Sequence, residues 1–173
     1  MPLRTLCSSC GKDLGPREAG TGPFGVCPNC EEHFNRQSVQ DMVKFLETLA
    51  HPALLVNQDL RVVAYNENCL RNLCNGTPQP KGLLGGEFLG CQNALLPERC
   101  GGSVACLDCA IRQAAAQTLR TGKPQRNIRA HLTRMEGNRK VRLELLVSTD
   151  KLGDLVQIIV NSFFTVMEPP TSA

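Results

Sequence analysis

The chain has 173 residues, of which 42% are hydrophobic and 20% are charged, a composition typical of a folded protein of ordinary domain size. The formal net charge of +3, without a cluster of Lys and Arg, is too small to indicate a nucleic-acid-binding face. No run approaches the roughly 20 apolar residues that cross a bilayer, and the first ten residues show no signal peptide, so we expect a cytoplasmic protein.

The first four of the ten cysteines form two Cys-x-x-Cys pairs, and we expect them to bind a metal, since disulfides are rare in a reducing compartment. Two such turns place four thiolates at the corners of the tetrahedron that Zn²⁺ prefers. About thirty residues are too few for a sufficient core, so the metal would supply folding energy. We therefore predict a structural zinc module over residues 1–36, with a redox-active dithiol and an iron–sulfur cluster as alternatives. The ligands are Cys7, Cys10, Cys27 and Cys30.

An amphipathic helix is predicted next, over residues 38–49 of a linking segment that spans 37–51. Ser38 is the candidate N-cap, with Asp41 as its partner in a capping box. Apolar residues recur at helical spacing until Pro52 ends the pattern; they are Val39, Met42, Val43, Leu46 and Leu49. This stripe fits a homodimer interface or packing on the following domain equally well.

Residues 53–122 predict short strands followed by helices. Strands are expected at Ala53–Val56 and Arg61–Tyr65, on either side of a turn over 57–59. A short helix follows over Asn66–Leu73, then an irregular region rich in Gly and Cys. A longer helix is expected over about Leu107–Arg120, with Gly122 near its C-cap.

The last third of the chain predicts three strands in consecutive antiparallel hairpins. Apolar residues alternate with polar ones over 128–132 and 141–147, and Leu155–Val160 is a third, more apolar run. Turn residues at 136–138 and 153–154 separate the strands. The fold class is therefore α+β, with a tail expected over 167–173.

A second group of four cysteines lies at irregular spacing among glycines, which favours a loop around a metal ion or an iron–sulfur cluster. The group is Cys91, Cys100, Cys106 and Cys109. Its last two members precede a helix, whose N-terminus would stabilise thiolates. Zinc and iron–sulfur clusters both accept four thiolates, so both stay open. Thiol redox sensing and simple burial are the alternatives, and we expect Cys69 and Cys74 to be structural.

The order of elements from Ala53 onward resembles a PAS domain. The segments 52–66 and 146–156 look like its first and last hairpins, and the middle, from Gly85-Gly86 through the second cysteine group to Gly122, is similar to a cysteine-rich PAS subgroup in bacterial signalling proteins. The resemblance implies a five-stranded antiparallel sheet with helices on one face over residues 52–166. The first cysteine group also resembles the short Cys-x-x-Cys modules that accompany PAS domains in bacterial sensors.

These features favour a non-catalytic cytoplasmic sensory or adaptor protein. The PAS-like domain would sense redox state or metal through its four cysteines, and the helix over 38–49 would convey the change to a dimer partner or another protein of a signalling pathway. We expect no output domain after Met167 and see no catalytic arrangement, so we expect no enzyme. One alternative is a zinc-ribbon regulator that binds nucleic acid, which the balance of acidic and basic residues around the ribbon disfavours; the other is a thiol redox protein.

Overall fold

The computed structural model describes residues 4–7, 10–16, 24–25 and 27–167. The chain divides into two compact units, Met1–Met42 and Val43–Ala173. Of the predicted tail, Met167 ends a strand and 168–173 lie outside the described residues. In the described part of the chain, no helix has the length and apolarity needed to cross a membrane.

The first unit contains a small three-stranded sheet. Its strands are β1 (Arg4–Cys7), β2 (Asp13–Pro16) and β3 (Phe24–Gly25), in the order β2-β1-β3. The β2 strand is antiparallel to β1, and β3 is parallel to it. Among the side chains described before Val43, the buried ones are Cys7 and Cys27. The described part of this unit therefore has cysteines where a larger domain has an apolar core.

The linking helix begins earlier than the sequence pattern predicts. Helix α1 spans Pro28–Glu47, so Ser38 is not its N-cap, and Ser38 and Asp41 lie within the helix. Pro28 occupies the first helical position, where its fixed φ and missing N–H are tolerated. The segment from Pro28 to Gln37 has few apolar residues and no apolar stripe, so hydrophobic periodicity could not detect its helical conformation.

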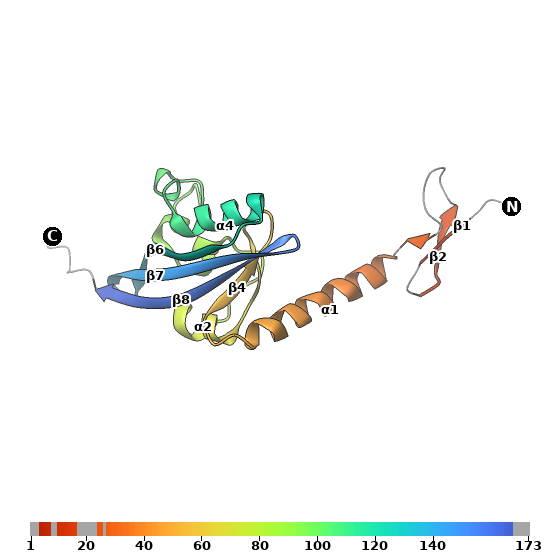
Figure 1. Cartoon of the computed structure of the whole chain (residues 1–173), viewed down its shortest axis with the longest axis horizontal. Helices are drawn as coiled ribbons and strands as arrows, with labels where there is room; N and C mark the ends of the chain where they lie inside the picture. Colours follow the sequence, from red (N-terminus) through yellow and green to blue (C-terminus); the bar gives the residue numbers. More distant parts are fainter. Residues whose placement is uncertain (1–3, 8–9, 17–23, 26, 168–173) are drawn as a thin grey trace. The chain divides into compact units, whose positions relative to one another are not determined.

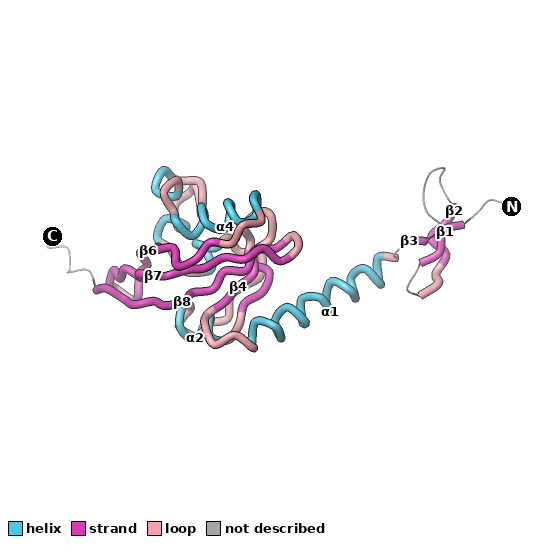
Figure 2. Tube along the Cα trace, in the orientation of Figure 1, coloured by secondary structure: helices cyan, strands magenta, loops and turns pink. Residues whose placement is uncertain are grey.

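The second unit is built on a five-stranded antiparallel sheet, as predicted, in the order β5-β4-β8-β7-β6 (Figures 1 and 2). The strands are β4 (Ala53–Val56), β5 (Val62–Tyr65), β6 (Gln125–Glu136), β7 (Arg139–Leu152) and β8 (Leu155–Met167). The bounds of β4 agree with the prediction. The last three strands are longer than predicted because residues beyond the predicted runs also pair, as between Glu136 and Arg139 and between Leu145 and Phe163.

Helices of the second unit cover one face of this sheet. They are α2 (Glu67–Leu73), α3 (Gly85–Phe88), α4 (Ala110–Thr121) and the short 3-10 helices η1 (Gln92–Leu95) and η2 (Val104–Cys106). Buried side chains of α2, α3 and α4 join one hydrophobic cluster with residues from all five strands. Figure 1 shows α4 over the strands, and its contacts are with β6, β7 and β8. The molecule is therefore a mixed α+β protein.

The start of α4 differs from the prediction, whereas its end agrees. The helix begins at Ala110 rather than Leu107, because η2 ends at Cys106 and Cys109 adopts an extended conformation as the N-cap. Gly122 ends the helix with φ of 71° and ψ of −3°, the left-handed conformation in which glycine costs least.

Candidate metal centre and cysteine cavity

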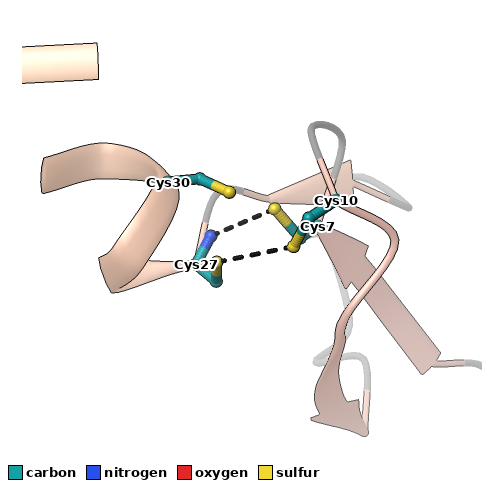
Figure 3. A group of neighbouring side chains, drawn as sticks. All are labelled: Cys7, Cys10, Cys27 and Cys30. Atoms are coloured by element: carbon teal, nitrogen blue, oxygen red, sulfur yellow. Dashed lines mark hydrogen bonds between the residues drawn. The ribbon is translucent and has the colours of Figure 1, made fainter. Parts of the chain in front are cut away.

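The first cysteine group comes together where the turn after β1 meets the start of α1. Cys7 ends β1, Cys10 lies in the following turn, Cys27 directly precedes α1 and Cys30 lies in its first turn. The turn is closed by the N–H of Gly11, which donates to the carbonyl of Cys7 across 2.9 Å. Figure 3 shows the four side chains converging on one place.

The four sulfur atoms lie close enough to bind one metal ion. All are within 4.8 Å of one another, and Sγ of Cys10 is 3.7 Å from Sγ of Cys27. A Zn–S bond of about 2.3 Å gives a tetrahedral edge of roughly 3.8 Å, so this spacing fits a single tetrahedral ion. The backbone N–H of Cys27 also donates to Sγ of Cys7 across 3.4 Å (Figure 3). The group could therefore hold a metal ion such as zinc.

All four members of the second cysteine group line one cavity of about 400 Å³ in the second unit. Cys91 lies before η1, Cys100 in the following loop, Cys106 at the end of η2, and Cys109 before α4. The rest of the lining is largely apolar and includes Val56, Leu89, Ile111, Ala115, Leu132 and Ile158. The fold thus brings four thiols from four short segments to one space between α4 and the sheet.

Hydrogen-bond donors surround three of these sulfurs. The backbone N–H of Gly86 donates to Sγ of Cys100 across 3.3 Å. Backbone groups of Asn93 and Ala94 hydrogen-bond to Cys91, and those of Gly101 and Ser103 to Cys106. The hydroxyl of Ser103 lies 3.3 Å from Sγ of Cys106. Donors that point at sulfur stabilise the thiolate, the form that binds metals.

The thiols of the cavity differ in acidity. Burial raises the pKa of Cys91 and of Cys100 above that of an ordinary thiol, and the nearby negative charges of Cys106 and Cys109 add to the effect. The hydrogen bond from Ser103 lowers the pKa of Cys106. The pKa of Cys106 is thus shifted in the predicted direction, but its largest cause is the hydrogen bond from Ser103 and not the helix terminus on which the prediction relied. Mutual repulsion among the four sulfurs would be relieved by a bound cation.

Arg112 and Arg129 both line the cavity, and Arg112 lies beside the loop that carries the cysteines. The guanidinium of Arg112, on the first turns of α4, lies so close to Gly101 that a Cβ there would collide with it. At Cys100 the charge of Arg112 partly offsets the burial that raises the pKa, and at Cys106 it adds to the lowering of the pKa by Ser103. Sequence reasoning gave no role to Arg112 or Ser103, although both lie in the segment that resembles the cysteine-rich PAS subgroup, because their roles depend on how the loop folds.

The remaining cysteines lie in the core and contact each other. Cys69 is in α2 and Cys74 follows it, and both belong to the hydrophobic cluster. The hydrogen bond between them, together with burial, raises the pKa of Cys69, whereas the same bond lowers the pKa of Cys74. Neither lines the cavity. None of the ten cysteines forms a disulfide.

No protein-family model matches the chain, and no curated protein matches it. The resemblance to PAS domains therefore stays a prediction from the sequence, and the functional interpretation rests on the geometry of the two cysteine groups.

Proposed function

We propose that this chain is a non-catalytic sensory or adaptor protein, in which a PAS-like domain responds to redox state or metal through Cys91, Cys100, Cys106 and Cys109. The observation that carries the proposal is that these four thiols line one cavity. The five-stranded antiparallel sheet with helices on one face is the architecture expected of a PAS-like domain. A ligand in the cavity would bind to α4 and to the loop before it at the same time.

The first cysteine group would hold Zn²⁺ in a structural role. Four thiolates complete a tetrahedron and leave no open position for a substrate, so this site would fold its unit rather than catalyse a reaction. The two Cys-x-x-Cys turns, one after β1 and one at the start of α1, are consistent with a zinc-ribbon-like module.

Contacts inside the second unit offer a route from the cavity to the end of α1. Thr118 of α4 and Thr149 of β7 are joined by a buried hydrogen bond of 2.7 Å. Asn66 follows β5, the edge strand of the sheet opposite β6. Its side chain donates to the carbonyl of Leu46, near the end of α1, across 3.0 Å. A change of occupancy that shifts α4 against the sheet could thus reach α1, but only to the extent that the ligand binds two conformations with different affinity.

The end of α1 would pass the change to a protein partner, including a second copy of the chain. Leu46 is completely buried, which shows that part of the apolar stripe over 38–49 packs within the second unit. Phe45 is 46% exposed and remains available to a partner. The proposal therefore places the partner on the exposed side of α1 and treats the homodimer as one form of it.

Hydrogen–deuterium exchange with peptide resolution tests this function. Protein prepared without oxygen would be compared before and after exposure to air, and before and after metal depletion. We expect changed protection over 85–112 and also over 43–51. The matched control is a Cys7→Ser/Cys10→Ser variant, which should keep the response over both segments. A response confined to 85–112 would contradict signalling through α1.

A further inference from the structure

We propose that the cavity lined by Cys91, Cys100, Cys106 and Cys109 binds a [4Fe–4S] cluster, with one cysteine thiolate on each iron. This inference rests on the proposed function for its choice of site and deepens it by naming the group that the site holds. Sulfur spacing and cavity volume favour a cluster over a single ion, and the hydrogen bonding and charge fit an anionic complex of four thiolates.

The sulfur spacing differs between the two cysteine groups. Within the part of the chain that the structure describes, the ligand atoms that gather within 4.8 Å of one another are those of Cys7, Cys10, Cys27 and Cys30. The four thiols of the cavity, all within the described residues, do not form such a compact group. A single zinc ion needs sulfurs roughly 3.8 Å apart. A cluster spreads its four thiolates over four iron atoms, so the sulfurs around it lie further apart.

The size and lining of the cavity also fit a larger group. Four thiolates around one ion leave no room between them, whereas these four line a space of about 400 Å³. Aliphatic side chains from β4, β6, β8 and α4 form much of its wall, among them Val56, Leu132 and Ile158. Such a wall limits access of water, which is one of the means by which proteins set the stability and potential of a cluster.

The hydrogen bonds around the sulfurs are those that a cluster with its thiolates requires. Cys91, Cys100 and Cys106 each receive backbone N–H groups, and the Gly86 donor lies 3.3 Å from Sγ of Cys100. Donors to sulfur are a known means of tuning a cluster. Gly86 also approaches Cys100 so closely that a Cβ at this position would lie 2.8 Å from its Sγ. The backbone of α3 is thus fitted to this sulfur.

Arg112 supplies compensating charge. Four thiolates outweigh the positive charge of an oxidised cubane cluster, so the complex is anionic. The guanidinium of Arg112 lies against Gly101 and interacts electrostatically with Cys100 and Cys106. A guanidinium stays protonated at any physiological pH and therefore offsets this charge permanently.

Anaerobic purification of the full chain, followed by elemental analysis and an absorption spectrum, tests the proposal. We expect about four iron and about four acid-labile sulfide per chain, and a broad band near about 400 nm from sulfide-to-iron charge transfer. If the purified protein has lost its cluster, the spectrum should return after incubation with inorganic sulfide and a ferric salt under argon, with a thiol reductant that reduces part of the iron to the ferrous state.

Two variants separate the two cysteine groups. Cys106→Ser should contain at least tenfold less iron per chain than the wild type and keep about one zinc. Cys10→Ser should lose the zinc and keep the iron. Cys69→Ala is the matched control, because Cys69 is buried in the same unit but does not line the cavity. Circular dichroism on all three variants identifies any that fail to fold. The iron and sulfide content of the wild-type protein tests the cluster even if a variant does not fold.

The outcomes distinguish this proposal from the function on which it rests. Two zinc ions and no iron would overturn the cluster and leave a metal-responsive site intact. An organic molecule in the cavity, or no bound group after reconstitution, would also overturn the cluster. If the protein contains no iron and exposure to air still changes hydrogen–deuterium exchange over 43–51, the thiols alone would be the sensor and the cluster would be overturned. A bound cluster without such changes would keep the cluster and contradict the signalling function.

Discussion

The backbone N–H of Gly86 donates to Sγ of Cys100 across 3.3 Å and links α3 directly to the loop that carries the cysteines. The two residues are fourteen positions apart, and a Cβ on Gly86 would lie 2.8 Å from that sulfur and 3.3 Å from Cβ of Cys100. The position of Cys100 in the cavity therefore depends on the missing side chain of Gly86.

The first prediction is that Gly86→Ala displaces Cys100 and weakens binding in the cavity. The methyl group would lie 2.8 Å from Sγ and 3.3 Å from Cβ of Cys100, so the sulfur would have to shift from its present position. We expect at least a tenfold drop in the metal or cluster retained after gel filtration. Gly85→Ala is the matched control on the same helix, because a Cβ there meets no atom within 4 Å. Equal retention by the two variants would show that this contact does not position Cys100.

The second prediction concerns Asn66, whose side chain is 1% exposed and joins four backbone groups. Its Oδ1 accepts from the N–H groups of Ala53 and Cys69, and its Nδ2 donates to the carbonyls of Leu46 and His51. Asn66→Ala would leave buried backbone groups unpaired, so we expect a loss of roughly 2–4 kcal/mol in the free energy of unfolding. Denaturant titration measures it.

The control for that prediction is Asn72→Ala, also in α2 but exposed, which should change the free energy of unfolding by no more than about 0.5 kcal/mol. A similar small effect for Asn66→Ala would contradict the role of Asn66 as the link between α1, β4 and α2.

Parts of the fold could be predicted because their signals are local. The strand β4 is a continuous apolar run between Pro52 and a turn, and Oδ1 of Asn57 accepts from the N–H groups of Asp59 and Arg61, which fixes that turn. Asn66 was expected to open a helix and is its N-cap. The first part of α1 lacks apolar periodicity, so nothing in the local pattern distinguishes it from a loop.

The two cysteine groups also differ in how far their geometry depends on the local sequence. Cys-x-x-Cys pairs create their geometry within one turn, so spacing alone was enough to single out Cys7 and Cys10 with their partners. The cavity depends on contacts between distant segments, such as Gly86 with Cys100 and Arg112 with Gly101. A sequence could suggest that the later cysteines act together, but not which donors, charges and apolar walls surround them.

The third prediction is a coupling between Thr118 and Thr149, both completely buried. The hydroxyl of Thr118 donates to the carbonyl of Lys123 across 3.0 Å, so Thr149 must be the donor in the 2.7 Å bond between the two hydroxyls. We expect Thr118→Val to cost about 2 kcal/mol, because it removes both bonds, and Thr149→Val about 1 kcal/mol. The double variant should cost less than the sum, as measured by denaturant titration. Additive losses would show that this bond does not hold α4 on β7.

The fourth prediction is that Ser103→Ala makes Cys106 less acidic. The hydrogen bond from Ser103 favours the thiolate and lowers the pKa of Cys106, so removing the hydroxyl should raise that pKa. In protein freed of its bound group, alkylation of Cys106 followed by mass spectrometry should then shift to higher pH. Ser162→Ala, exposed on β8, is the control and should leave the profile unchanged. An unchanged profile in Ser103→Ala would assign the acidity of Cys106 to the backbone donors instead.

The fifth prediction is that removing metal from the first cysteine group unfolds its own unit and spares the large sheet. The buried side chains described before Val43 are Cys7 and Cys27, so four unbound thiols would leave that part of the chain without a core. A chelator that strips zinc should therefore abolish amide protection over residues 4–7 and 10–16. The hairpins of β6, β7 and β8 pair with each other and should keep theirs, because their core lies within the second unit. Protection over 4–7 and 10–16 that persists without metal would mean that the small sheet folds by itself. Restored protection on adding zinc, and not on adding magnesium, would identify thiolate coordination as the cause, since magnesium prefers oxygen ligands.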